Sequence, residues 1–179
     1  MQNPKTLEQL SAFESLGSGE AFVDRILEII EHILLFEDFE RSEIEILSRY
    51  LRCYRAEAGI EMIREGESGD FMLLVISGNL EILKLDPRGL PRQLGVAGPG
   101  KTLGEMSLID GEPRFASCAT LEPTVFAVLD RDGLIRLVSE EPKIGVKILM
   151  ELLMLLNQRL RSVSGELMKC LDNQRLRVR

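Results

Sequence analysis

Closely spaced glycines divide the middle of this chain into short apolar segments, and this pattern limits the possible folds more than any other feature. Ten glycines lie between Arg52 and Asp130 in a chain of 179 residues. Between them, residues 71–76 are apolar throughout, which predicts a strand buried on both faces. Residues 80–85 alternate apolar and polar side chains, which predicts a strand with one solvent-exposed face. Many short strands separated by frequent turns predict a closed β-roll or a β-sandwich.

The linkers between the segments predict how the strands are joined. Only residues 77–79, Ser-Gly-Asn, separate the first two segments. A linker of this length forms a tight turn, so the sequence predicts that these two strands pair as a hairpin. Two further strands are expected at residues 114–121 and 124–130, joined by a short turn.

Helical patterns precede the glycine-rich region. The first 35 residues are expected to be helical with a flexible break at residues 17–19, after which apolar residues recur at helical spacing: Phe22, Ile26, Ile29, Ile30 and Ile33. Ser42 is expected to open a second helix, because Glu45 follows at the spacing of a capping box. We therefore assign residues 1–35 to an N-terminal helical extension and residues 36–141 to the β-roll.

The chain after Asp130 returns to a helical pattern and keeps it. Pro142 lies where the first turn of a helix tolerates proline, and it offers a hinge before the final helix. Residues 142–179 then carry apolar residues at alternating spacings of three and four, at Val146, Leu149, Leu153, Leu156, Leu160, Val163, Leu167 and Cys170. Such an a/d seam is typical of a coiled coil and also of one helix packed on its own domain. The spacing alone leaves both possibilities open.

Composition argues against several functional classes. The net charge of −7 argues against nucleic-acid binding, although the C-terminal tail is basic. We interpret that tail as a solvated helix end rather than a contact with an acidic partner or a membrane. The most apolar stretch, residues 148–156, is about half of a membrane span, and no signal peptide is visible. Three cysteines without CxxC spacing favour a reducing compartment, so we expect a cytoplasmic protein.

Sequence motifs for catalysis are also missing. The chain has one histidine, His32, which is too few for the metal-ligand cluster of a cupin-type enzyme. We interpret His32 as a surface or packing residue. No nucleophile elbow or Walker loop occurs in the sequence. We therefore expect no catalytic residues, no metal ion and no enzyme activity.

One segment, residues 98–118, carries residues suited to bind an anion. Gly104 permits close approach of the backbone, and residues 105–110 are long enough for a short helix whose N-terminal amides favour a negative charge. Arg114 follows at the start of a strand, and a guanidinium that faces the start of that helix would clamp a phosphate. Glu105 cannot bind phosphate, but it can accept a hydrogen bond from a neighbouring hydroxyl group.

This segment resembles the phosphate-binding cassette of the cyclic-nucleotide-binding domain family, which includes the regulatory subunits of cyclic-AMP-dependent protein kinase and the catabolite activator protein. The match includes Gly-Glu-Met-Ser-Leu at residues 104–108 and the nine-residue step from Glu105 to Arg114. A glycine-rich run at residues 59–70 also matches, and the resemblance extends over residues 36–174. It implies an antiparallel β-roll with N-terminal helices and a long C-terminal helix, which binds cAMP or, less readily, cGMP. In the family the helix after the roll packs on its own domain and can also form a dimer, so the resemblance favours a homodimer through the C-terminal helix.

The resemblance also implies a role for each cassette residue. Glu105 matches the glutamate that accepts the ribose 2′-hydroxyl, and Arg114 matches the arginine that pairs with the cyclic phosphate. Backbone amides nearby line the sugar and the phosphate, so the expected ligand-binding residues are Gly104, Glu105, Met106, Ser107, Arg114, Phe115 and Ala116. The alternative is that Glu105 and Arg114 form a structural ion pair in a roll that binds no ligand.

Phe115 departs from the family pattern, which usually places a small residue after the arginine. The phenylalanine ring can stack on a purine base, or it can fill the base pocket and exclude the ligand. The sequence leaves both possibilities open.

Together these features predict a non-catalytic cyclic-nucleotide sensor that signals through its helices. Too few residues follow Leu167 for a helix-turn-helix domain, so we expect the signal to pass to an unidentified effector protein. Residues 131–145 are expected to follow the cassette when a ligand binds. The alternative function is a ligand-free roll that dimerises or docks a partner.

Overall fold

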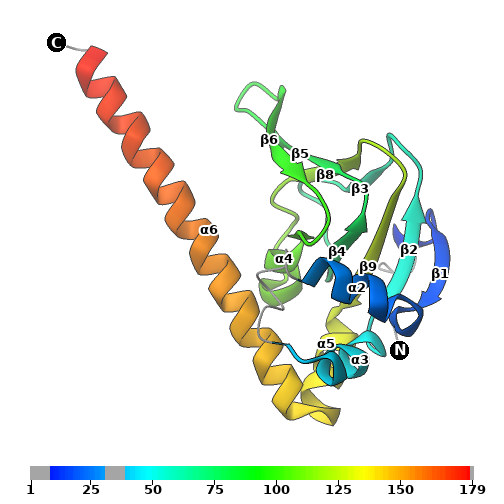
Figure 1. The fold of residues 1–179 in the computed structure, drawn as a ribbon. Helices are drawn as coiled ribbons and strands as arrows, with labels where there is room; N and C mark the ends of the chain where they lie inside the picture. Colours follow the sequence, from blue (N-terminus) through cyan, green and yellow to red (C-terminus); the bar gives the residue numbers. More distant parts are fainter. Residues whose placement is uncertain (1–8, 31–38, 178–179) are drawn as a thin grey trace.

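The computed structural model describes residues 9–30 and 39–177, which form two antiparallel sheets flanked by helices (Figure 1). The first sheet has the strand order β1-β2-β9-β4-β7, and the second has the order β3-β8-β5-β6. In these orders, the first sheet contains Glu14–Ser18, Arg52–Ala56, Thr124–Asp130, Phe71–Ser77 and Thr102–Leu103. The second contains Glu61–Ile63, Ser117–Thr120, Leu80–Leu85 and Pro91–Ala97. The antiparallel β-roll with flanking helices that the sequence predicts is confirmed.

Strand β4 is buried on both faces because each face belongs to a different core. Its odd-numbered residues from Phe71 to Val75 join a cluster inside the roll that also contains Leu80 and Phe126. Its even-numbered residues from Met72 to Ile76 join a second cluster, between the five-stranded sheet and the helices. The uninterrupted apolar run predicted this burial, and the structure confirms it.

The predicted hairpin between residues 71–76 and 80–85 is wrong, because β4 and β5 belong to different sheets. Gly78 between them has a φ of +90°, and a Cβ there would lie 2.8 Å from the carbonyl oxygen of Pro123. The chain therefore bends sharply at a position that only glycine tolerates, and it crosses from one sheet to the other.

The N-terminal region is less helical than the sequence predicts. Residues 17 and 18, expected in a flexible break, belong to β1, which pairs with β2 at the edge of the five-stranded sheet. A short 3-10 helix, Gly19–Phe22, and α2, Val23–Ile30, follow this strand. His32 and Ile33 lie outside the described residues. The domain boundaries at residues 35 and 141 stay predictions.

Helix α3, Arg41–Ser48, has a capping box, but not the predicted one. The box is formed two residues earlier, with Glu40 at the N-cap, and the Glu43 carboxylate accepts a hydrogen bond from the Glu40 amide at 2.9 Å. Glutamate is an unusual N-cap, whereas serine is a common one. The sequence pattern therefore predicted the helix start at Ser42, two residues too late.

Two further helices follow the roll: α5, Arg131–Glu140, and α6, Pro142–Arg177. Asp130 caps α5 by accepting a hydrogen bond from the Gly133 amide at 2.7 Å. Pro142 is the first residue of α6, as the sequence predicts. The two helices approach closely at Gly145, where a Cβ would lie 2.6 Å from the Cα of Val138.

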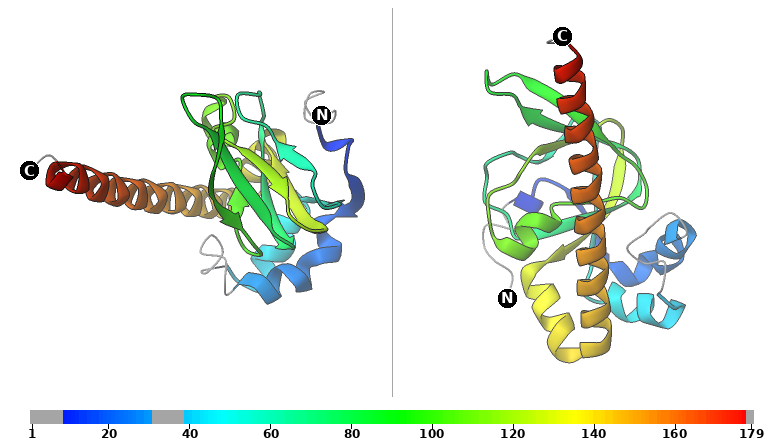
Figure 2. Two further views of the ribbon diagram at one scale, coloured as in Figure 1. Left: turned by 90° about the horizontal axis from the view of Figure 1, so that it is seen from above. Right: turned by 90° about the vertical axis from the view of Figure 1, so that its left-hand side faces the viewer.

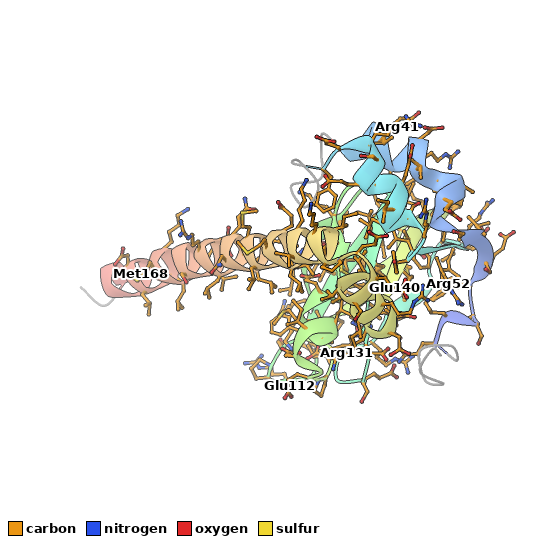
Figure 3. The ribbon with its side chains drawn as sticks, turned by 90° about the horizontal axis from the view of Figure 1, so that it is seen from below. Arg41, Arg52, Glu112, Arg131, Glu140 and Met168 are labelled. Carbon is orange, nitrogen blue, oxygen red and sulfur yellow. The ribbon has the colours of Figure 1, made fainter. Side chains whose placement is uncertain are left out.

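Helix α6 packs on the roll only along its first half. Ile144, Ile148 and Leu152 are buried in the core next to β4, whereas the second half extends away from the roll (Figures 1 and 2). Most residues of the predicted seam are exposed along this helix, among them Val146, Leu153, Leu160, Val163 and Leu167. Met168 lies on the same projecting part (Figure 3). In the described part of the chain, no helix is long and apolar enough to cross a membrane.

Candidate functional site

A cavity of about 790 Å³ lies between the roll, α4 (Glu105–Asp110) and α6. Its walls come from β5, β6, α4, the loop after α4 and the middle of α6. All seven residues that the sequence singled out line this one cavity: Gly104, Glu105, Met106, Ser107, Arg114, Phe115 and Ala116. The structure therefore brings the predicted residues together at one place, between the second sheet and the long helix.

Gly104 allows α4 to begin directly beside Arg114. It adopts a left-handed conformation with φ of +84°, and a Cβ there would lie 2.6 Å from Nη1 of Arg114 and 2.8 Å from the carbonyl oxygen of Phe71. Leu108 donates the first helical hydrogen bond, to the Gly104 carbonyl. The amides of the three residues before Leu108 therefore lie at the N-terminal end of the helix, next to the guanidinium.

Arg114 is buried to 4% exposure and lies in a loop, because β8 begins only at Ser117 instead of the predicted residue 114. Its backbone bonds to the loop at Gly66 and Glu67. Its Nη1 donates to the carbonyl oxygens of Phe71 at 2.7 Å and Gly104 at 3.0 Å. Burial lowers the pKa of Arg114 to about 10, so it still carries its charge at neutral pH.

Glu105 is 1% exposed and is tied to α6 rather than to Arg114. Arg159 of α6 donates from Nη1 to Oε1 of Glu105, and from Nη2 to the carbonyl oxygen of Thr102 at 2.8 Å. Among the described residues, no ion pair joins Glu105 to Arg114. The two residues therefore do not form the structural pair that the sequence left open.

Three buried side-chain atoms in the described residues have no hydrogen-bond partner: Oγ1 of Thr102, Oε2 of Glu105 and Nη2 of Arg114. All three residues line the same cavity. Buried polar atoms without a partner are costly, so a cluster of them in one cavity indicates a place for a polar ligand. The set comprises a cationic donor, a carboxylate acceptor and a hydroxyl group.

Phe115 does not fill the cavity. The residue is 55% exposed, and Lys84 Nζ lies 4.3 Å from the centroid of its ring. Lys84 also donates to the carbonyl oxygen of Phe115 at 2.6 Å and to Glu65 Oε1 at 2.7 Å. The ring therefore lines the edge of the cavity beside Lys84.

Helix α4 is also linked to α5 by Arg131. The guanidinium donates to the carbonyl oxygens of Ser107 at 2.9 Å and Leu108 at 3.0 Å, at the C-terminal end of α4. Figure 3 shows Arg131 beside this end of α4, near Glu112. Arg131 therefore joins the C-terminal end of α4 to the start of α5.

Sequence reasoning missed two residues that line the cavity, Thr102 and Arg159, and also Lys84, which contacts Phe115 at its edge. Thr102 lies in β7, inside the segment that the sequence singled out, but was given no role there, and Lys84 lies in β5, outside that segment. Arg159 had no local signal, because it meets Glu105 and Thr102 only through the packing of α6 on the roll. Within the part of the chain that the structure describes, no group of histidine, cysteine or acidic residues could hold a metal ion.

Fold and cavity together define a class of protein: a β-roll whose buried arginine and glutamate face a cavity covered by a long helix. The matching family model is described as the cyclic nucleotide-binding domain, and it covers residues 55–141. The crystal structure of a cyclic nucleotide-binding domain from Methylobacillus flagellatus KT is 36% identical, with a TM-score of 0.83 over 94% of this chain and 96% of that one. The chain therefore belongs to the cyclic nucleotide-binding domain family.

Two longer relatives are similar over most of this chain. The CRP-like cAMP-activated global transcriptional regulator of Mycobacterium tuberculosis is 31% identical over 140 residues, which is 78% of this chain and 61% of the regulator. The crystal structure of the Thermus thermophilus catabolite activator protein has a TM-score of 0.69 at 30% identity, covering 75% of this chain and 61% of that one. This chain thus spans about three fifths of their length.

Proposed function

We propose that this protein is a non-catalytic sensor that binds a cyclic purine nucleotide in the cavity beneath α6. The observation that carries the proposal is the cluster of unpartnered atoms from Thr102, Glu105 and Arg114 in one cavity. Arg114 Nη2 and the amides at the start of α4 are suited to a phosphate. Glu105 Oε2 is suited to a ribose hydroxyl, and a cyclic nucleotide presents both groups close together.

Cyclic AMP is the proposed ligand before cyclic GMP. Relatives at about 30% identity are named as cAMP-activated or as a cyclic AMP receptor protein. The cavity is lined mostly by apolar side chains, such as Ile109, Leu156 and Leu160. Phe115 offers no hydroxyl group that would favour a guanine amino group.

We expect Glu105 to transmit ligand binding to α6, because its two carboxylate oxygens have different surroundings. Oε1 is occupied by Arg159 of α6, and Oε2 is buried without a partner. A ribose hydroxyl on Oε2 would therefore share the carboxylate with α6. Ligand binding is then coupled to the position of α6, and through α6 to an effector protein.

The exposed seam of α6 supports a homodimer as the signalling unit. Leu156, Leu160 and Val163 line the cavity as well as occupying seam positions, so dimerisation and ligand binding share residues. Leu167 lies on the seam outside the cavity, and Leu167→Asp should give a monomer in light scattering, whereas Gln158→Asp should stay dimeric. A monomeric wild-type protein at every concentration would refute the dimer.

Cys170 gives a second test of the same dimer. It is exposed and continues the seam, whereas Cys53 and Cys118 are buried, which raises the pKa of both thiols to about 12. In a parallel coiled coil the two copies of Cys170 would face each other. Oxidation with copper phenanthroline should then give a disulfide-linked dimer that Cys170→Ser abolishes. The free thiols suit a reducing compartment, and a cytoplasmic location stays a prediction.

Thermal unfolding with added nucleotides tests the proposed function. Cyclic AMP at 100 times its dissociation constant should raise the melting temperature by about 5–10 °C. Linear 5′-AMP, which lacks the cyclic phosphate, is the control and should act much more weakly. No shift with cyclic AMP or cyclic GMP would favour the ligand-free module instead.

A further inference from the structure

Residues 9–13 form a segment, called here the N-terminal strap, that packs against the side of the roll next to Arg114. Leu10 is 2% exposed and belongs to the core inside the roll, together with Phe71. Phe13 contacts Phe126 edge to face, with ring centroids 5.4 Å apart. The strap lies outside residues 55–141, which the family model matches.

The loop at residues 66–69 holds Arg114 in place. The Arg114 amide donates to the carbonyl oxygen of Glu67 at 2.8 Å, and the Gly66 amide donates to the carbonyl oxygen of Arg114 at 2.9 Å. Gly69 lies so close to the guanidinium that a Cβ would be 2.2 Å from Nε. The position of the guanidinium therefore depends on the position of this loop.

Gln9 connects the strap to the same loop. Its Nε2 donates to the carbonyl oxygen of Ser68 at 3.0 Å, across 59 residues of sequence. A second cavity, of about 150 Å³, lies here and is lined by Gln9, Phe13, Phe71 and Arg114, among others. Loop and guanidinium thus have room to shift on this side unless the strap restrains them.

We propose that the N-terminal strap positions Arg114 and so sets the affinity for the phosphate of the ligand. The guanidinium rests against Gly69 and against the Phe71 ring, whose centroid lies 4.3 Å from its central carbon. Gln9 of the strap bonds to Ser68, which is next to Gly69, and Leu10 of the strap packs in the same core as Phe71. Gln9 is a positioning residue in this arrangement and does not touch the ligand. The inference rests on the proposed function, because it assigns the strap a role in that binding site.

The test compares Gln9→Ala with Glu14→Ala, a matched change at an exposed position of β1 just after the strap. Gln9→Ala removes one hydrogen bond at the surface and leaves the core intact, so the protein should fold. We expect cyclic AMP to bind about threefold or more weakly to Gln9→Ala, within the range that one neutral hydrogen bond can produce. Phe13→Ala should weaken binding further, and Glu14→Ala should have no effect.

Hydrogen–deuterium exchange of the unliganded proteins provides a readout that does not need a ligand. The backbone amides of residues 64–70 should exchange faster in Gln9→Ala than in Glu14→Ala, while β9 stays equally protected. Unchanged exchange in this loop, or faster exchange with unchanged affinity, would overturn the inference. If the wild-type protein binds no cyclic nucleotide, the proposed function fails. The exchange data then still show whether the strap restrains the loop.

Discussion

Arg159 and Glu105, 54 residues apart in the sequence, form an ion pair that joins the middle of α6 to the first residue of α4. The carboxylate is buried, and the guanidinium is partly exposed at the edge of the cavity. Burial also lowers the pKa of the Arg159 guanidinium, although it remains charged at neutral pH. The pair is a direct link between the residue proposed to hold the ribose and the helix proposed to carry the signal.

Replacing Arg159 should therefore separate ligand binding from the response of α6. Arg159→Met leaves Glu105 Oε1 buried without its donor, so we expect the free protein to lose about 1–3 kcal/mol of stability. Hydrogen exchange should show that cyclic AMP no longer changes the protection of residues 152–163. Arg161→Met, at an exposed position of the same helix, is the control and should behave like the wild type. An unchanged ligand response in Arg159→Met would contradict the coupling.

Substitutions at Arg114 and Glu105 should distinguish their roles. Arg114→Ala removes the cationic donor and should weaken cyclic AMP binding by about 2–5 kcal/mol. Arg114→Lys should restore it only in part, because an ammonium group cannot donate a two-pronged bond. Glu105→Gln keeps an acceptor and should cost less. Calorimetric titrations measure these losses. If both residues instead change only the stability of the free protein, their role is structural.

The affinity for cyclic AMP should depend on pH through Arg114. Its pKa in the free protein is about 10, below the ordinary 12.5, because of burial. The buried charge therefore opposes folding below about pH 10, and this penalty decreases as the pH rises from there. Binding needs the charged form, so the affinity should be constant from about pH 7 to pH 9 and fall above about pH 10. A steady affinity up to about pH 11 in a still-folded protein would contradict this assignment.

Phe115→Ala should weaken binding slightly and should not create it. The ring lies at the edge of the cavity against Lys84, so its removal opens no blocked pocket. A loss of about 1 kcal/mol or less is expected, at the low end of a base–aromatic contact. Fluorescence titration with a labelled cyclic AMP analogue measures this change. A clear gain in affinity would mean that the ring obstructs the ligand.

The sequence predicted the cassette well because its parts are close together in the chain. Glycine at residue 104, a short helix and Arg114 lie within about a dozen residues, and their backbone geometry is set locally. The burial of both faces of β4 and the position of Pro142 at the start of α6 were also predicted correctly, because both follow from residues adjacent in the sequence.

The errors arose where distant contacts decide the structure. Residues 17 and 18 resemble a flexible break, but pairing with β2 makes them part of a strand. A three-residue linker indicates a hairpin, but the contact of Gly78 with the turn at Pro123 sends the chain to the other sheet. Arg159 gives no local sign that it reaches Glu105, because only the packing of α6 on the roll brings them together.

Isothermal titration of the wild-type protein and Arg114→Ala with cyclic AMP decides whether Arg114 binds the ligand. We expect saturable binding of one cyclic AMP per chain to the wild type, with affinity reduced by at least about 30-fold in Arg114→Ala. Arg114→Ala also removes the hydrogen bonds to the carbonyl oxygens of Phe71 and Gly104, so we expect the free variant to be less stable by about 1–3 kcal/mol, and the titration uses protein that is folded at the working temperature. No heat of binding for the wild type, or equal affinity in both proteins, would contradict this role of Arg114.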